Sequence, residues 1–252
     1  MTPPGTLAGL LDFLLPAGCI ACGTWIPSAQ GGGLVCGTCR SRLSPGGWPR
    51  CPRCHLPQGT GRAPAATCRA CASWPETLSA ARWAVALQPP ADTLVHALKY
   101  EGWRGLAEEM GAAMARLPLP RNVLRDKAVL VPVPTTAERL RIRGYNQAGE
   151  LAQSVSRRLE IPVMDALSRT RSGVTQVALH PSERWANVRG AFAPRGAPEG
   201  LPQGVHAILV DDVLTTGSTA AAAASVLVEM GVCSVTLLTF ARALPDRARQ
   251  AA

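Results

Sequence analysis

The segment 207–219, AILVDDVLTTGST, decides the fold class of this chain. It opens with a short apolar run, which is typical of a buried parallel strand. Two adjacent acids, Asp211 and Asp212, follow the run, and a loop of hydroxyl residues and glycine then leads into an alanine-rich stretch over 218–230. That stretch predicts a helix, so the segment combines a strand, a tight loop and a helix, as open α/β sheets do.

The same alternation extends on both sides of this segment. We predict strands over 80–87, 128–133, 163–167, 205–210 and 234–241, and helices over 92–100, 105–116, 146–159 and 218–230. Asp92 is expected to cap the first of these helices, and Pro118 and Pro120 to end the second. Strands that alternate with helices imply an α/β fold, a mostly parallel sheet with flanking helices, over a domain from 79 to 252.

The loop after the two acids has the composition of a phosphate site. Its backbone N–H groups and hydroxyls lie at the start of a helix, where anions bind, and a glycine lets the chain curl around one. The two acids can accept hydrogen bonds from sugar hydroxyls and hold Mg²⁺ through water. The candidates are Asp211 and Asp212 as catalytic acids, and Val213, Thr215, Thr216, Gly217, Ser218 and Thr219 as substrate-binding residues. A capped helix beside two solvated acids, or a receiver-domain aspartate, leaves the hydroxyl-rich loop unexplained.

An arginine-rich stretch, PTTAERLRIRGYNQ over 134–147, follows the strand predicted at 128–133. We predict a loop at the carboxyl edge of the sheet, where Arg139 and Arg143 can hold a pyrophosphate group opposite the phosphate loop. The alternative is a solvated basic face.

Residues 168–204 are predicted to be loop-rich, with one helical turn near 181–187. Long loops in compact domains are usually functional or disordered, and a mobile lid that excludes water from the substrate fits the first case. His180 is interpreted as a surface residue of this stretch rather than as a base.

Eight of the nine cysteines form four Cys-x-x-Cys pairs, which are Cys19/Cys22, Cys36/Cys39, Cys51/Cys54 and Cys68/Cys71. Thirteen residues separate the first pair from the second, and thirteen separate the third from the fourth. Two such pairs supply four thiolates in tetrahedral geometry, so we predict two structural Zn²⁺ sites within an N-terminal region over 1–78. Sequential pairing is expected; an interleaved arrangement, an iron–sulfur cluster and a redox pair are the alternatives.

Other residues of interest lie outside this pattern. His55 follows a complete set of ligands and is interpreted as a surface residue, and Cys233 as a small core residue. Residues 1–16 predict a short amphipathic helix that opens the N-terminal region.

The composition bounds the class of protein. Of 252 residues, 47% are hydrophobic and 17% charged, which excludes global disorder. No stretch approaches the roughly 20 apolar residues needed to span a bilayer, and the run at 7–15 lacks a positive flank. We therefore expect no membrane span, no signal peptide and a cytoplasmic location. The net charge of +9 favours anionic partners, either phosphorylated small molecules or nucleic acid.

Several segments together resemble known proteins. The segment 207–219 resembles the 5-phosphoribosyl-1-pyrophosphate (PRPP) signature of type I phosphoribosyltransferases. With the four cysteine pairs, LKYEG at 98–102, VPVPTTAERLRIRGYNQA at 131–148 and LSRTRSGVTQVALHPSERWANVRGAF at 167–192, the chain resembles the ComF family of competence-associated proteins, related to GntX.

This resemblance implies a type I phosphoribosyltransferase fold that binds PRPP with Mg²⁺, preceded by a double zinc ribbon. It implies a role in DNA uptake for natural transformation, or in carbon-source utilisation for GntX-like members. Lys99 and Gly144 match the family pattern and join the candidate substrate-binding residues. The resemblance does not define the acceptor of the ribosyl group.

Two hypotheses follow. The first is an enzyme that transfers a ribosyl group from PRPP by positioning and electrostatic support of the leaving pyrophosphate. The second is a non-catalytic module that senses PRPP and binds single-stranded DNA or proteins of the DNA-uptake machinery. Six arginines and two acids in residues 1–80 give a net charge of +4 there. Trp25, Trp48 and Trp74 either stack on bases or pack around the ribbon cores.

Overall fold

The computed structural model describes residues 18–26, 33–43, 49–58, 68–121, 123, 127–170, 190–196 and 201–244. The helix predicted for residues 1–16 and the helical turn near 181–187 lie outside the described residues. Within them, no helix combines the length and the apolar character that crossing a bilayer requires.

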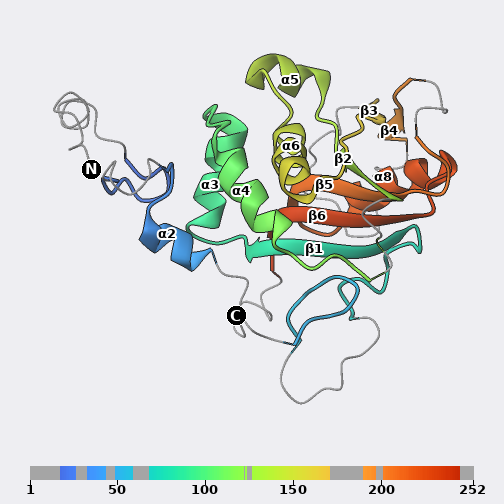
Figure 1. Ribbon diagram of the computed structural model, residues 1–252, viewed down its shortest axis with the longest axis horizontal. Helices are drawn as coiled ribbons and strands as arrows, with labels where there is room; N and C mark the ends of the chain where they lie inside the picture. The colour runs from blue at the N-terminus through green and yellow to red at the C-terminus, as the bar shows by residue number, and fades with distance from the viewer. Residues whose placement is uncertain are drawn as a thin grey trace, which may run out of the picture.

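Four parallel strands form the central sheet (Figure 1). Their order is β1 (Leu78–Ala86), β6 (Ser234–Arg242), β5 (His206–Leu214) and β2 (Ala128–Pro132). Strand β5 is longer than predicted, because its pairing with β6 continues through Asp211, opposite Thr239, to Leu214, opposite Arg242. The two acids are therefore fixed in the sheet itself rather than in the loop that follows it.

Helices cover both faces of the sheet. Helices α3 (Ala91–Tyr100), α4 (Leu106–Ala115) and α6 (Gln147–Leu159) pack on one face, and α8 (Ser218–Glu229) packs on the other (Figure 1). Successive residues of a strand point to opposite faces, so Ile208 joins the α3–α4–α6 core while Leu209 joins the α8 core. Burial on both sides explains why the central strands are nearly continuous apolar runs.

Two local predictions need correction. The arginine-rich stretch contains a helix, α5 (Ala137–Arg143), which the Thr136 side chain caps at Arg139 N and Gly144 ends with φ of 80°. Asp92 lies inside the first turn of α3, whose N-cap is Pro90, so Asp92 does not cap the helix. A helix had been missed at α5 because none of its residues is buried, so no apolar stripe marks it.

The strand predicted over 163–167 is also wrong. Val163 makes only an isolated bridge with Leu130, and the strand lies further on as β3 (Leu167–Arg169). Strand β3 pairs antiparallel with β4 (Phe192–Pro194), so the stretch predicted to be loop-rich contains a small second sheet. Short two-stranded pairings give little sequence periodicity, which is why this sheet was not predicted.

The two cysteine-rich regions pack on opposite faces of the domain. The first contains α2 (Gly37–Arg42) and contributes Cys19, Ile26 and Val35 to the core beneath α3, α4 and α6. The second contributes its buried cysteines and Trp74 to the core beneath α8. In Figure 1 the first lies beside α3 at the left, and the second lies below β1.

Candidate functional site

A cavity of about 500 Å³ lies where β2 and β5 end, between α3 and α5. Most of the predicted site residues line it, and these are Lys99, Arg139, Arg143, Asp211, Asp212, Val213, Thr215 and Thr219. The other four predicted residues, Gly144, Thr216, Gly217 and Ser218, belong to the adjoining turns rather than to the cavity wall. The carboxyl edge of a parallel sheet is where ligands bind in open α/β folds.

Asp212 is the buried member of the acid pair. Its side chain is 4% exposed, and its Oδ1 lies 2.9 Å from the Nζ of Lys99. Its Oδ2 is buried and has no hydrogen-bond partner within the described part of the chain. A buried carboxylate requires a charge partner, and the second oxygen leaves unused acceptor capacity in a residue that lines the cavity.

Asp211 has the strongest electrostatic perturbation of the site. Burial and the neighbouring charge of Asp212 raise the pKa of Asp211 to about 7, against the opposing effects of Lys99 and Arg169. The Asp212 amide also donates to Asp211 Oδ1 at 2.9 Å. A carboxyl group with a pKa near neutrality is only partly ionised at neutral pH, and the positive charge of a bound cation would favour its ionised form.

Three arginines from two elements face the acids. Arg139 and Arg143 come from α5, and Arg143 lies over the Tyr100 ring with 5.4 Å between its guanidinium carbon and the ring centroid. Arg169 comes from β3, and burial, reinforced by the charge of Arg139, lowers its pKa. The Nε of Arg169 is buried without a hydrogen-bond partner among the described residues. The cavity thus holds both anionic and cationic groups, as an anionic ligand carrying a metal ion requires.

Sequence reasoning missed several cavity residues. Arg169 had been assigned to a lid rather than to the cavity wall, Asp92 only to a helix cap, and His96 and Tyr100 had no assigned role. Asp92, His96 and Lys99 are spaced at i, i+4 and i+7, so one face of α3 carries them all to the cavity. That periodicity of polar residues was the available signal.

The phosphate loop is supported from behind by an aromatic ring. Gly217 is the N-cap of α8 with φ of 88°, and Thr216 Oγ1 lies 2.9 Å from Ser218 Oγ. The indole Nε1 of Trp74 donates to the Thr216 carbonyl at 2.9 Å. A Cβ at Gly217 would lie 2.8 Å from the Trp74 ring, so only glycine fits there.

The three tryptophans that could either stack on bases or pack around the ribbon cores therefore differ in their exposure. Trp74 is 4% exposed and packs against the phosphate loop, so it is not free to stack. Trp25 is 54% exposed, and Trp48 lies outside the described residues.

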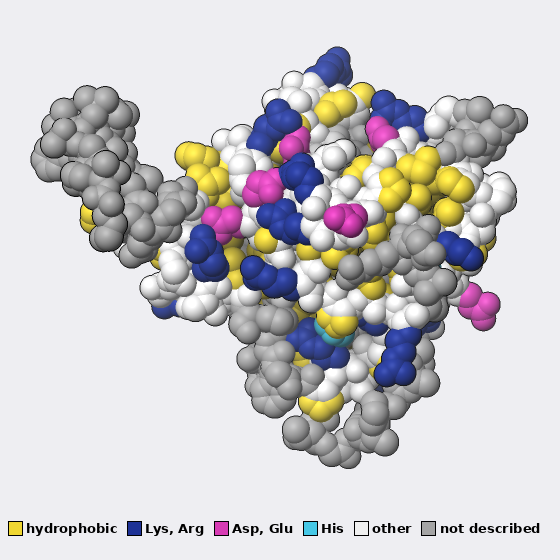
Figure 2. All heavy atoms as spheres, in the orientation of Figure 1, with side chains coloured by type: hydrophobic (Ala, Val, Ile, Leu, Met, Phe, Trp, Pro, Cys, Tyr) yellow, Lys and Arg dark blue, Asp and Glu magenta, His cyan; other side chains and the backbone are white. Residues whose placement is uncertain are grey.

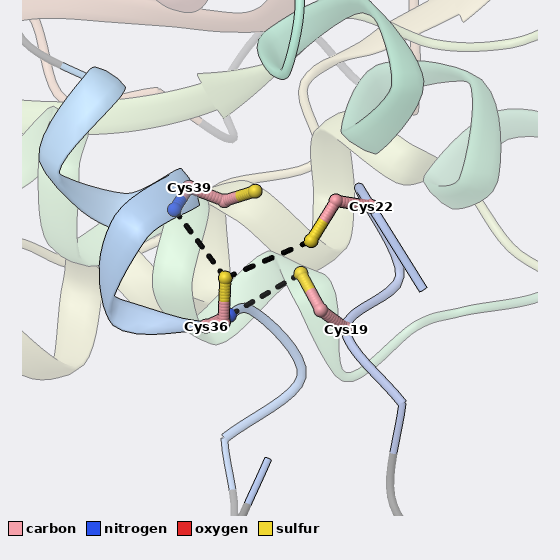
Figure 3. Close-up of side chains that lie close together, drawn as sticks. All are labelled: Cys19, Cys22, Cys36 and Cys39. Atoms are coloured by element: carbon pink, nitrogen blue, oxygen red, sulfur yellow. Dashed lines mark hydrogen bonds between the residues drawn. The ribbon is translucent and has the colours of Figure 1, made fainter. Parts of the chain in front are cut away.

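The first cysteine cluster has the geometry of a metal site. Cys19, Cys22, Cys36 and Cys39 converge from two loops and the start of α2 (Figure 3). Cys22 Sγ and Cys36 Sγ are 3.8 Å apart, and the Cys36 and Cys39 amides donate to Cys19 Sγ and Cys36 Sγ. A tetrahedral zinc ion with Zn–S bonds of about 2.3 Å holds its sulfur atoms about 3.8 Å apart, so the four residues fit zinc.

The second cluster has the same geometry and is more deeply buried. It comprises Cys51, Cys54, Cys68 and Cys71, and the first, second and fourth of these are 0% exposed. Three Sγ···Sγ distances are 3.3, 3.7 and 3.8 Å. The sequential pairing predicted from the spacing is confirmed, and the two clusters are consistent with two zinc sites.

Arginines surround this second cluster. Arg242, 2% exposed, and Trp83 both donate to the Cys54 carbonyl, and the charge of Arg242 opposes the effect of burial, which raises the pKa of Cys54. Four thiolates around Zn²⁺ carry a net charge of about −2. A buried cationic neighbour offsets that charge where water cannot.

Two single-residue predictions are wrong. His55 is half-buried, with its ring edge-on to Trp83 at 6.0 Å between centroids, and burial and the charge of Arg50 lower its pKa to about 3. Cys233 is exposed and lies just before β6, so it is not a core residue. His55 was misplaced because its partner Trp83 is 28 residues away in sequence. Cys233 was misplaced because β6 begins only at Ser234 and its buried residues follow from Val235.

The face of the molecule that carries α4 and α6 has mixed charge. Figure 2 shows basic and acidic side chains next to one another there. Glu108 pairs with Arg157 and Arg158, and Glu150 pairs with Arg104. The net positive charge is therefore not gathered into a uniform basic patch on this face.

Comparisons with known proteins agree with this architecture. A family model for the double zinc ribbon domain matches residues 10–72, and one for the phosphoribosyl transferase domain matches residues 146–251. The DNA utilization protein YhgH of Escherichia coli K12 is 33% identical over 87% of this chain and 95% of its own length. Competence protein ComFC of Bacillus subtilis 168 is 30% identical over 82% of this chain and 84% of its own length.

A solved structure described as the allosteric regulatory enzyme of purine biosynthesis is 20% identical, with a TM-score of 0.33, over 55% of this chain and 25% of its own. The sequence relatives extend along most of both chains. The double zinc ribbon model covers both cysteine clusters, and the phosphoribosyl transferase model covers α6, β5, α8 and β6. This chain therefore belongs to the ComF family of competence-associated proteins, which join a double zinc ribbon to a phosphoribosyltransferase domain.

Proposed function

We propose that this protein binds PRPP together with Mg²⁺ in the cavity between α3 and α5, and that it acts in the cytoplasm in DNA uptake. One observation carries the proposal: a single cavity of about 500 Å³ gathers the acid pair, the phosphate loop and three arginines. The names of two relatives, a DNA utilization protein and a competence protein, support the DNA-related role. Residues 1–78 and 79–252 would form its two structural units.

Each part of the ligand has suitable partners. The amides and hydroxyls of 215–219 would hold the 5′-phosphate, and Asp211 and Asp212 would accept hydrogen bonds from the ribose hydroxyls. Arg139 and Arg143 would bind the pyrophosphate, with Lys99 and Gly144 beside it. This distribution places negative ligand groups on basic residues and N–H donors, and hydroxyls on carboxylates.

The acid pair also fits a magnesium ion. Asp212 keeps one buried oxygen without a partner among the described residues, and the pKa of Asp211 is raised to about 7 by burial and by the charge of Asp212. Both features show that the acid pair has negative charge and an acceptor oxygen that a cation would stabilise. A bound Mg²⁺ would supply charge neutralisation for the pyrophosphate leaving group.

In the catalytic form of the proposal, the protein positions the ligand rather than attacking it. The loop 215–219 and the α5 arginines hold the two ends of PRPP, so the bond from C1 to the pyrophosphate oxygen is fixed between them. As that bond breaks, the arginines stabilise the negative charge on the leaving group, and the carboxylates of Asp211 and Asp212 stabilise the positive charge on the ribose. The acceptor then forms the new bond to C1.

Calorimetry with zinc-replete protein tests this proposal. PRPP should bind with heat in the presence of Mg²⁺ and at least tenfold more weakly in EDTA-treated buffer after zinc content has been verified. Asp212→Asn should weaken binding at least about tenfold, since it removes the charge paired with Lys99. Asp165→Asn is the matched control, because Asp165 is exposed and pairs with Arg195 away from the cavity. Absence of Mg²⁺-dependent binding would refute the proposal.

A second candidate function is binding of single-stranded DNA at the cavity mouth by a PRPP sensor. Tyr100 is 67% exposed and Ile142 is 82% exposed, and both line a pocket together with Arg143. Trp103, also near the end of α3, is 45% exposed. Exposed aromatic rings beside arginines suit stacked bases and phosphates.

Fluorescence anisotropy with a labelled thymidine oligonucleotide distinguishes the two candidates. For the DNA-binding candidate, Tyr100→Ala should weaken binding about tenfold, while Trp25→Ala on the first ribbon should leave it unchanged. Equal losses would instead place the DNA on the ribbon. Pyrophosphate release from PRPP, measured with and without the oligonucleotide, tells an enzyme from a sensor.

A further inference from the structure

One side chain of the second ribbon reaches the phosphate loop. Trp74 follows the zinc ligand Cys71 by three residues, and its amide donates to the Cys71 carbonyl at 3.1 Å. Its buried indole donates to the Thr216 carbonyl at 2.9 Å, across 142 residues of sequence. A zinc-ligand segment is therefore bonded directly to the loop that precedes α8.

Arg53 fixes the position of that indole. It lies between the ligands Cys51 and Cys54, and its guanidinium carbon is 5.9 Å from the centroid of the Trp74 ring. The guanidinium donates to four carbonyls, those of Cys71, Trp74, Pro75 and Leu78, at 2.8 to 3.2 Å. Both cysteine pairs of the second cluster thus determine where Trp74 lies.

The contact sets the orientation of a peptide group in the loop. In a planar trans peptide the carbonyl and the N–H point in opposite directions. Because the Thr216 carbonyl points to the Trp74 indole, the N–H of Gly217 points away from it. The ring also fills the space that a Cβ at Gly217 would need, at 2.8 Å, so the loop cannot shift toward it. The indole therefore holds one amide donor in the outward orientation that binding a phosphate requires.

We propose that Trp74 is a positioning residue for the phosphate loop, through which an intact second zinc site sets the affinity for a sugar 5′-phosphate. This inference rests on the proposed function of the loop. The first zinc site has no equivalent contact among the described residues, because its ribbon meets α4 through Arg40 and Glu109. Loss of zinc from the second site alone should loosen the loop.

A pair of tryptophan variants tests the contact. Trp74→Phe keeps a ring but removes the donor, whereas Trp83→Phe removes an indole donor to Cys54 in the same ribbon without touching the loop. Calorimetry would use ribose 5-phosphate and pyrophosphate as separate probes. Trp74→Phe should weaken ribose 5-phosphate binding about tenfold and leave pyrophosphate binding unchanged, since only the first probe needs the loop. Trp83→Phe should change neither.

A second measurement needs no ligand. Amide hydrogen exchange over 215–221 would be compared in Cys68→Ser and Cys22→Ser, each of which removes one thiolate from one cluster. Exchange in the loop should become at least tenfold faster in Cys68→Ser and should remain unchanged in Cys22→Ser. Zinc content per chain would confirm which site has been emptied.

The outcomes separate this inference from the proposed function. Wild-type protein that binds neither probe would refute the proposed phosphate site, and the exchange comparison would still decide whether the ribbon holds the loop. If Trp74→Phe lost zinc or unfolded, the exchange comparison would again decide. An unchanged ribose 5-phosphate affinity in folded, zinc-replete Trp74→Phe, or equal loop exchange in the two cysteine variants, would overturn the inference.

Discussion

The first and second ribbons have the same cysteine spacing but meet the sheet domain differently. The first keeps Cys22 exposed and contacts α4 through the surface pair of Arg40 and Glu109. The second buries three of its four cysteines in a core shared with β1 and α8, and Arg242 from β6 reaches the Cys54 carbonyl. Two zinc sites with the same ligands can therefore contribute differently to the stability of the domain, because each contribution depends on the contacts that the surrounding loops make with the sheet and its helices.

The largest effect is expected from removing one buried ligand in each cluster. Cys54→Ser should eliminate zinc from the second site and lower the melting temperature of the whole sheet domain. The reason is that zinc binding contributes about 10 kcal/mol to folding at such sites. Cys39→Ser should release the first ribbon and leave the sheet folded. Zinc per chain and circular-dichroism melting measure the difference; equal loss of sheet stability would contradict the comparison.

The arginines of the two ribbons provide a smaller contrast. Arg53→Met removes donors to four carbonyls and should lower the free energy of unfolding by about 3 kcal/mol. Arg40→Met removes a pair whose arginine is 54% exposed, which typically contributes less than about 1 kcal/mol. Urea denaturation at fixed zinc content measures both. If the two variants lower the free energy of unfolding equally, the second ribbon does not contribute more than the first to the stability of the domain.

The smallest effect is a pH dependence that neither ribbon should alter, because none of the described residues of either ribbon lines the cavity. The pKa of Asp211 is raised to about 7, so it binds a proton below that pH and must release it to meet a cation. Mg²⁺–PRPP affinity should therefore increase about tenfold from pH 6 to pH 8, and the increase should persist in Cys22→Ser.

The same raised pKa has the opposite consequence for the free protein. Below pH 7 the folded state keeps a proton on Asp211 that the unfolded chain, with an ordinary pKa near 3.8, has already released. Stability from this group therefore falls as the pH rises from about 4 to 7.

The variant Asp211→Asn tests the pH dependence of Mg²⁺–PRPP affinity. It should reduce that dependence to the part that comes from the ligand phosphate alone; an unchanged profile would exclude Asp211 as its source.

The candidate site was largely predictable because its parts are local in sequence. A strand, two acids and a glycine loop occupy the continuous stretch 207–219, and the arginines of α5 follow a neighbouring strand. Arg169 was misplaced because β3 pairs with β4 across a separation in which Arg169 lies opposite Phe192, 23 residues later, with weak periodicity on either side. Trp74 gave no sequence signal for the loop, since its partner Thr216 lies 142 residues away.

By itself, the sequence determined the α/β alternation, the eight candidate thiol ligands and the anion-binding composition of the loop. These depend on hydrophobic periodicity and short spacings, which the chain carries locally. Only the tertiary structure decided that the cysteines pair sequentially, that the two ribbons pack on opposite faces, and that the second one supports the phosphate loop. Side-chain packing between distant segments determines such contacts, and no local pattern encodes which surfaces will meet.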